Sequence, residues 1–443
     1  MRWLRVVATM ALVLGVAQTA RAQTTSGLAG LLLRFFSPTN PVVLAANPDP
    51  NLSHAAHFVS QSAAQGILTQ LNQGIATQLS TFPLGSSSGG FTYTFDEALG
   101  VYNRTAQSFG PIITERPLTI GKGKFSFAVN YQHATWDTFE SQDLRSGDIQ
   151  LYLVHEDSNR DGSNLAPWFE GDIIRADLSL ELKTDTTVLF ANYGLGERFD
   201  IGVAVPFQKV EMSASILTSI ERLSTSADPF IVHQFDDGST EHVYPESGSA
   251  SGIGDVLVRA KWNFLRKPTA GLALAVDLRL PTGDETNLLG SGATQTKAFL
   301  VAGGSPGRFS PRGSIGYTFS SGGSEFTGDL PDELGYTAGF DLAPHPRLTI
   351  TADFVGRTLL DTQRLVQATE TFAYRLRTDP TLRETVRTTA SSETGNLNLY
   401  LASVGFKLNP VGRLLLVGNV LLSLGDSGLQ DKVTPIVGLD YSF

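Results

Sequence analysis

Residues 432–443, KVTPIVGLDYSF, decide the fold of this chain. Apolar and polar side chains alternate along them, and residues of one parity point to one face of an extended strand. The apolar members of the series are Val433, Val437, Leu439, Tyr441 and the final residue, Phe443. A strand that stays apolar to its last residue is unusual in a soluble protein. It is typical of the closing strand of an outer-membrane β-barrel, whose outer face contacts lipid.

The first 22 residues indicate export. They combine Arg2 and Arg5, an apolar run over residues 6–17, and the sequence Ala20-Arg21-Ala22. This order predicts a secretory signal peptide cleaved near Ala22, because a run of about a dozen apolar residues is too short to span a membrane. The chain contains no cysteine, which excludes a disulfide scaffold, a lipid-attachment cysteine and thiol catalysis.

Composition narrows the class of protein further. The formal charge is -10, and removal of residues 1–22 would make it more negative because that segment holds three arginines and no acid. Such an acidic chain is a poor nucleic-acid binder, so no nucleic-acid partner is expected. No later segment offers about 20 consecutive apolar residues. With 44 glycines and 17% charged residues, the sequence fits many strands joined by turns.

Residues 23–120 differ from the rest of the chain. Proline is frequent in the early part, and from His54 to Phe82 apolar residues recur at helical spacing: Ala64, Leu68, Leu71, Ile75 and Leu79. We expect an amphipathic helix there. The whole segment is either a periplasmic tail or a plug that enters the barrel, and the sequence leaves both open.

From residue 121 onward the pattern is one of repeated strands. Their apolar sets, read as lipid-facing, have up to five members each, as in Val256, Val258, Ala260, Trp262 and Phe264, and in Leu178, Leu180, Leu182, Val188 and Phe190. Short connections (194–198, 266–271, 344–347, 409–413) alternate with long ones (137–170, 212–250, 282–295, 321–333, 359–395, 425–431). Barrels of this class have short periplasmic turns and long outer loops. We therefore predict an all-β, antiparallel up-and-down barrel over 121–443.

The count of strands follows from this alternation. It is consistent if residues 172–193 form one long strand, which gives twelve strands. Fourteen is the alternative, if the FTYTF stretch (91–95) and another short segment join the wall.

Four stretches resemble one family: YGLGERFDIGVAVPF (193–207), GIGDVLVRAKWNF (252–264), LAVDLRLPTGDE (274–285) and RFSPRGSIGYTFS (308–320). They are similar to the meta-pathway phenol-degradation family of transporter-like outer-membrane barrels, a family grouped with the long-chain fatty-acid channels. The resemblance implies location in the outer membrane of a Gram-negative-type bacterium, contact with its lipid, and delivery by the barrel-insertion machinery. It also implies passive transport of a small hydrophobic or aromatic solute. It leaves the compound, the direction of transport and the oligomeric state open.

Charged residues occupy the parity opposite to the predicted lipid face. We expect them to line the lumen, either as ion pairs that hold the wall rigid or as a selectivity lining for a solute. They are Arg175, Asp177, Glu181, Lys183, Asp255, Arg259, Lys261, Asp277, Arg279, Asp353 and Asp440.

One loop resembles half of a calcium site. In HEDSNRDGSN (155–164), Asp157, Asn159 and Asp161 place oxygen side chains at every second position before Gly162. The twelfth position is Trp168 instead of Glu, and loops rich in Asp, Asn and Gly produce this spacing as ordinary turns. Ca²⁺ is the one cofactor that the sequence raises, and a plain surface turn is the alternative.

Enzymatic motifs are not found, and we expect no catalytic residues. The seven histidines do not form a recognisable Ser–His arrangement. A channel is therefore the expected function. The alternatives are a structural or adhesion barrel that acts through loops 212–250 and 359–395, and, with less support, an outer-membrane hydrolase.

Overall fold

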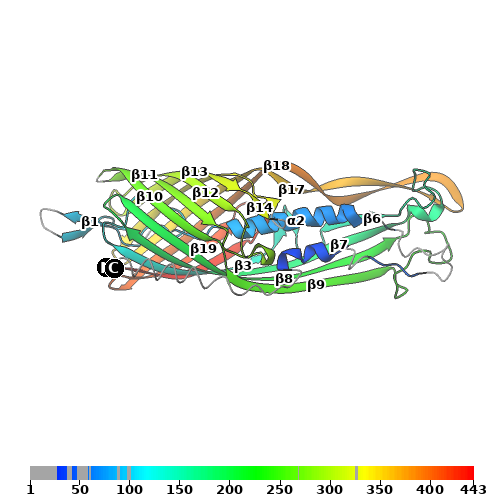
Figure 1. Cartoon of the computed structure of the whole chain (residues 1–443), viewed down its shortest axis with the longest axis horizontal. Coiled ribbons are helices and arrows are strands. Elements are labelled where there is room, and N and C mark those ends of the chain that lie inside the picture. The colour runs from blue at the N-terminus through cyan, green and yellow to red at the C-terminus, as the bar shows by residue number, and fades with distance from the viewer. Residues whose placement is uncertain are drawn as a thin grey trace.

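Twelve antiparallel strands close into a barrel in the computed structural model (Figure 1). The structure describes residues 27–36, 42–46, 58, 61–86, 90–96, 101–267, 269–324 and 328–443. The predicted signal peptide, residues 1–22, lies outside the described residues. No helix in these described ranges is both long and apolar enough to cross a membrane.

The wall is a ring of neighbouring strands that begins and ends at one strand, Ile173–Gly194 (β7). Going round the barrel from β7, the other wall strands are β3 (Phe125–Trp136), β21 (Val433–Ser442), β19 (Leu414–Ser423), β18 (Asp379–Val411), β17 (Leu348–Leu376), β16 (Glu333–His345), β13 (Phe309–Ser321), β12 (Thr294–Gly304), β11 (Ala270–Leu280), β10 (Val256–Arg266) and β8 (Phe199–Glu221), which pairs with β7 again. The last strand of the chain, β21, closes the ring against β3, the first wall strand. The prediction of twelve strands, with 172–193 as one strand, is confirmed.

The strands outside the ring explain why fourteen is not the count. The FTYTF stretch belongs to a separate hairpin of β1 (Tyr93–Asp96) and β2 (Val101–Arg104), which pair only with each other. Strands β6 (Ile149–Val154) and β9 (Glu241–Ile253) pair with the far halves of β7 and β8, beyond the ring.

The outer face of the ring is apolar. Large hydrophobic side chains remain exposed on strand after strand: Ile315 is 56% exposed, Phe319 60% and Val437 57%. A soluble protein rarely leaves so continuous an apolar belt in water, whereas a barrel in a bilayer requires it. The strand parity predicted from Phe443 is therefore correct for most of the wall.

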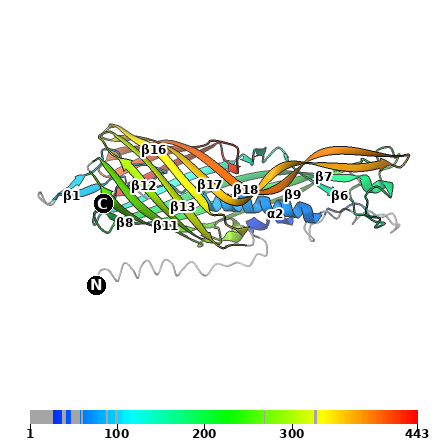
Figure 2. The same ribbon diagram turned by 90° about the horizontal axis from the view of Figure 1, so that it is seen from above.

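An extension rises beyond one end of the barrel. Strands β6, β7, β8 and β9 form its one side, and the long hairpin of β17 and β18 forms the other (Figure 2). This end also carries the long connections, so by the rule of the class it faces the outside; we call it the outer end. Segments 212–250 and 359–395, expected as long outer connections, are largely strands, because each continues a wall strand past the ring.

The helix expected from the 3.6-residue spacing is present as Gln61–Thr81 (α2). It lies along the barrel axis, between the two sides of the extension (Figures 1 and 2). Leu68, Leu71 and Ile75 are fully buried there, in a core that also includes the short helices η1 (Leu28–Gly30) and η2 (Leu32–Arg34). The outer end of the lumen is thus filled by an apolar core.

The parity assigned to β7 differs from the structure. Leu178, Leu180 and Leu182 face this core and Val188 and Phe190 face the lumen, whereas the alternation predicted that all five face lipid. The physical reason is that α2 and the N-terminal segment present an apolar surface inside the extension. The sequence of β7 alone therefore does not show whether its apolar side chains face lipid or α2, because both surroundings favour hydrophobic contacts.

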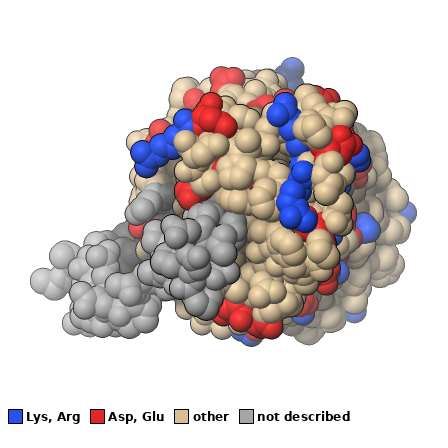
Figure 3. Space-filling model, turned by 90° about the vertical axis from the view of Figure 1, so that its right-hand side faces the viewer, with Lys and Arg blue, Asp and Glu red and all other residues tan. Residues whose placement is uncertain are grey.

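The remaining short elements cover the outer end. They are β4 (Thr138–Phe139), β5 (Gln142–Asp143), η4 (Trp168–Gly171), η5 (Glu285–Asn287), β14 (Gly323–Ser324), β15 (Gly328–Asp329) and β20 (Leu429–Gln430). Viewed from this end, the surface carries acidic and basic side chains in separate small groups, with no single sign dominating (Figure 3).

Candidate functional site

The barrel lumen holds a segment of the N-terminal region. Residues 105–120, which we call the strap, follow the β1–β2 hairpin and lead to β3. Backbone amides anchor the strap and its surroundings to inward carboxylates: Gly90 N–H donates to Asp440 (2.8 Å) and Ile120 N–H donates to Asp200 (3.0 Å). These contacts place Gly90 and Ile120 inside the wall, whereas the β1–β2 hairpin projects beyond the inner end of the barrel (Figure 1).

Glu115 is the main acidic contact of the strap. Its carboxylate, almost fully buried, pairs with Arg259 of β10 and accepts a longer hydrogen bond from Lys261 (3.4 Å). Arg259 in turn makes a two-pronged ion pair with Asp277 of β11, at 2.5 Å for both contacts. Buried charges of both signs are thus paired, which is the condition for burying them at all.

A second buried cluster surrounds Arg312 of β13. Its guanidinium pairs with Asp341 of β16 (2.5 Å) and Asp353 of β17, and donates to the Thr114 hydroxyl of the strap (2.7 Å). Thr114 also donates to Asp353 (2.9 Å). The strap is therefore held on two sides of the lumen by charge-assisted hydrogen bonds, which are the stronger kind.

Two cavities lie along the same wall strands, on either side of the strap. The upper cavity, of about 170 Å³, is bounded by the outer halves of β10 to β17 and by Thr81, Leu84 and Thr114. The lower cavity, of about 340 Å³, lies at the inner ends of β11, β12 and β13, against Arg116 and Pro117. Arg312 and Asp341 border the lower cavity, so the layer of ion pairs around the strap separates the two.

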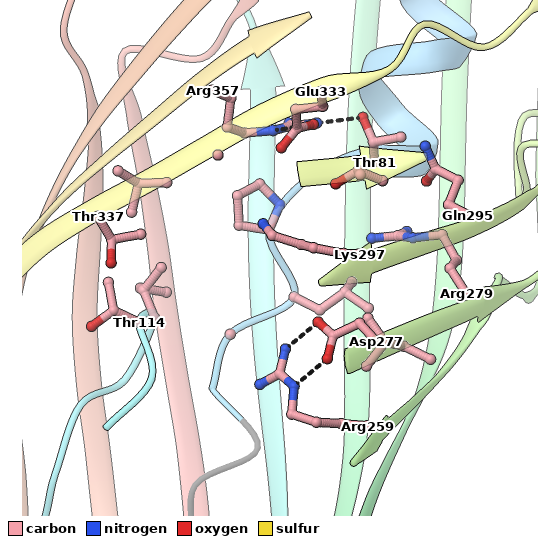
Figure 4. Close-up of a pocket in the computed structure, with 18 of the residues that line it drawn as sticks. Thr81, Thr114, Arg259, Asp277, Arg279, Gln295, Lys297, Glu333, Thr337 and Arg357 are labelled. Atoms are coloured by element: carbon pink, nitrogen blue, oxygen red, sulfur yellow. Dashed lines mark hydrogen bonds and ion pairs between the residues drawn. The ribbon is translucent and has the colours of Figure 1, made fainter. Parts of the chain in front are cut away.

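The upper cavity is mainly charged on one side (Figure 4). Arg357 pairs with Glu333 (2.6 Å) and donates to the Thr81 hydroxyl at the end of α2 (2.9 Å). Arg279 donates to the Ser80 carbonyl, so two cations sit at the C-terminus of α2, where the helix dipole favours positive charge. Lys297 reaches into the same cavity from β12.

The sequence-predicted lumen residues fall into two groups. Seven face the barrel interior: Asp255, Arg259, Lys261, Asp277, Arg279, Asp353 and Asp440. Of these, Arg259, Asp277 and Arg279 line the upper cavity, and Asp255 lies at the outer rim, where it accepts hydrogen bonds from Gly283 and Ser291.

Arg175, Asp177, Glu181 and Lys183 are placed differently from the expectation. Their neighbours of opposite parity on β7 form the core, so these four lie on the far face of the extension, and Glu181 pairs with Lys183 near the surface. Arg175 pairs with Asp177 (3.0 Å). They do not reach the lumen, because their side chains point to the face of β7 opposite the one that packs on α2.

Several lumen charges were not singled out from the sequence: Glu115, Arg116, Lys297, Arg312, Glu333, Asp341, Arg357 and Lys407. Those on the wall strands share the inward parity of their strands, so the alternation contained the signal. Glu115 and Arg116 carry no such signal, since the strap is irregular and the wall residue that pairs with Glu115, Arg259, is 144 residues away in sequence.

The loop expected as half a calcium site forms an exposed turn. Asp157 accepts from the backbone amides of Asp161 (3.1 Å) and Gly162 (2.7 Å), and Asn159 accepts from Asp161 N–H (2.9 Å). These side-chain oxygens accept hydrogen bonds from backbone amides of the same turn. Within the described residues, the group with metal-ligand geometry is a different one, Asp236, Asp237 and His242, which lies at the outer surface and is partly exposed.

The closed ring, the apolar belt and the charged lumen define the chain as an outer-membrane β-barrel whose lumen is occupied by its own N-terminal segment. Residues 171–343 match the model of the family described as "Putative MetA-pathway of phenol degradation", which confirms the resemblance seen in the sequence. A comparison with curated proteins finds no match.

A comparison with solved structures finds matches that include a channel, a FadL homologue and a transporter. An outer-membrane channel from Pseudomonas putida F1 is 12% identical, with 74% of this chain and 99% of that chain covered and a TM-score of 0.44. A Pseudomonas aeruginosa FadL homologue is 11% identical, with 74% and 91% covered and a TM-score of 0.30. The Ralstonia pickettii toluene transporter TbuX is 10% identical, with 74% and 92% covered and a TM-score of 0.27.

Proposed function

We propose that this barrel is an outer-membrane channel for small hydrophobic or aromatic compounds, described here in its closed state. The observation that carries the proposal is the pair of cavities stacked along one wall and separated by the strap. A barrel whose only role is structural gains nothing from open space in its lumen, because unfilled volume costs stability. The family match over residues 171–343 supports the same function.

The closed state follows from the strap contacts. Thr114 and Glu115 are held by Asp353, Arg312 and Arg259, between the two cavities. Removing one partner of a buried ion pair costs about 3–5 kcal/mol, because the other charge is left uncompensated. The position of the strap is therefore sensitive to single charges, and a change there converts a closed lumen into an open one.

The test is to replace Glu115 by Gln. The Gln side chain keeps the shape but loses the ion pair with Arg259 and the contact with Lys261. We expect single-channel conductance in planar bilayers, and the rate of phenol uptake by expressing cells, to rise above wild type. Glu211→Gln is the matched control, since Glu211 pairs with Lys209 at the surface of the extension. If wild type and Glu115→Gln both leave the bilayer as tight as a protein-free one, the channel function is wrong.

A structural or adhesive role is the second candidate, and one observation favours it. The β17–β18 hairpin extends far past the ring, and Leu382 and Val386 near its tip are 49% and 59% exposed. Exposed apolar side chains at the tip of an outer extension suit contact with a partner. Replacing both by Ser would abolish adhesion of expressing cells if this role holds, and would leave conductance unchanged.

A further inference from the structure

We propose that the upper cavity is a binding site for a small amphiphilic anion, a one-ring carboxylate in size, whose negative group is bound by Lys297. This inference rests on the proposed channel function and deepens it, because it gives the solute a charge. The three observations that carry it are the distribution of charge around the cavity, the apolar surface opposite, and the cavity's volume.

The lining of the cavity has more positive than negative groups. Its ionic residues are Arg259, Arg279, Lys297 and Arg357 against Asp277 and Glu333. Both acids are already paired: Asp277 accepts two hydrogen bonds from the Arg259 guanidinium, and Glu333 accepts two from the Arg357 guanidinium.

Two cations are then left without a carboxylate, Arg279 and Lys297. Arg279 donates to the Ser80 carbonyl at the end of α2, so we assign the anion to Lys297. Among the described residues, no carboxylate oxygen lies within 4.0 Å of its ammonium group. Asp255, the next acid toward the outer rim, is held by the amides of Gly283 and Ser291. Figure 4 shows Lys297 and Arg279 side by side in the cavity, between the two ion pairs. The ammonium group of Lys297 lies over the ring of Phe299, 5.7 Å from its centroid, but has no carboxylate to balance its charge. Such a site favours an anion, since burial of an uncompensated charge is costly.

The opposite side of the cavity is apolar. Phe190 of β7 and Ala204 of β8 form a small cluster with Leu84 and Leu257. Ile113 and Val355 belong to a second cluster and also line the cavity. A solute that is charged at one end and apolar at the other satisfies both sides at once. A fully apolar solute leaves the charge of Lys297 without an anion to balance it, and a small inorganic anion leaves the apolar side without contacts.

The volume sets the size of the solute. The cavity of about 170 Å³ exceeds the roughly 150 Å³ that accommodates benzene in an engineered protein cavity. One aromatic ring with a carboxylate fits this space, and a long-chain fatty acid does not fit it in full. Benzoate is therefore a suitable probe, and benzyl alcohol is its neutral counterpart with the same ring.

The experiment measures binding to the purified full-length barrel in detergent by isothermal titration calorimetry. We expect wild type to bind benzoate at least about tenfold more tightly than benzyl alcohol, because a hydrogen bond to a charged group contributes about 1.5–3 kcal/mol. Lys297→Met should weaken benzoate binding about ten- to a hundredfold and leave benzyl alcohol within about twofold. Lys297→Arg, which restores the charge, should recover benzoate binding.

Two controls make the result decisive. Lys209→Met removes a lysine from the surface of the extension and should leave benzoate binding unchanged. Heat-modifiable migration on gels shows that each variant is a folded barrel. Equal binding of benzoate and benzyl alcohol by wild type, no saturable binding of either, or full benzoate affinity in Lys297→Met would each overturn the site. Because binding is measured without transport, a barrel that binds benzoate but never conducts contradicts the channel function and leaves the site intact.

Discussion

Asp172 shows how one buried side chain organises the outer loops. At the start of β7, its carboxylate accepts hydrogen bonds from the backbone and hydroxyl groups of Ser224 and Thr225 and pairs with His233 (2.9 Å). Both Asp172 and His233 are fully buried. Burial alone raises the pKa of Asp172, but the hydrogen bonds from His233 and Thr225 outweigh it, so the pKa lies below the ordinary value.

Replacing Asp172 by Asn should loosen the segment 222–235. Loss of the charge weakens hydrogen bonds that contribute about 1.5–3 kcal/mol each, so amide hydrogen exchange in this segment should rise about tenfold or more at pH 7. Because the folded-state pKa is depressed, this stabilisation is fully present above the unfolded pKa and is lost as pH falls through the folded value. The exchange ratio of variant to wild type should therefore approach one in strong acid.

The control for this prediction is Asp236→Asn, which changes an exposed aspartate of the neighbouring turn. Its exchange in 222–235 should match wild type at every pH. A ratio for Asp172→Asn that stays constant from neutral to acid pH would show that the carboxylate's charge does not hold the loop.

At the scale of elements, α2 and β7 mark how far the sequence could predict this structure. The helix was predicted because five apolar residues, Ala64, Leu68, Leu71, Ile75 and Leu79, lie on one stripe, and these five are buried. The strand β7 was also predicted, but its apolar side was assigned to lipid. Alternation of apolar and polar residues shows that the two faces of a strand differ, but it does not show what each face contacts. That information comes from α2, which is distant in sequence.

The same limit applies to the lumen. Lumen residues on regular strands, such as Arg259 and Asp277, were predicted because their parity is opposite to an exposed apolar set. The contacts of the strap with these lumen residues were not predicted. Glu115 pairs with Arg259, and Thr114 accepts from Arg312, only because the folded chain brings distant segments together. Alternation along a strand predicts which side chains face the lumen, but it does not predict which distant segments contact each other.

Two substitutions on α2 should have opposite effects on stability. Leu71 is fully buried, so Leu71→Ala should destabilise the extension by about 2–5 kcal/mol. Gly66 is exposed and a Cβ there meets no atom within 4 Å, so Gly66→Ala should stabilise the helix by about 0.5–1 kcal/mol. Thermolysin cleavage of the outer loops measures both, with faster cleavage in the first variant and slower in the second. Equal cleavage of Leu71→Ala and wild type would mean that α2 does not support the extension.

The whole molecule has an unusual path. The helix α2 lies in the core of the outer extension, whereas the strap that follows it lies in the lumen and leads to β3 at the inner end. The chain therefore runs through its own barrel from the outer to the inner end before it forms the wall. This requires residues 61–81 to be on the outside of the membrane when folding is complete.

Cysteine labelling tests this path directly, because the chain has no cysteine of its own. Gly66→Cys places a thiol on the exposed side of α2, and Gly196→Cys places one in the short turn between β7 and β8, where a Cβ also meets no atom within 4 Å. A membrane-impermeant maleimide added to intact cells should label Gly66→Cys and leave Gly196→Cys unlabelled. Permeabilised cells should label both. Labelling of Gly196→Cys but not of Gly66→Cys in intact cells would place the extension on the periplasmic side. Labelling of neither variant before permeabilisation would place α2 on the periplasmic side. Either result would contradict a chain that passes outward through the pore.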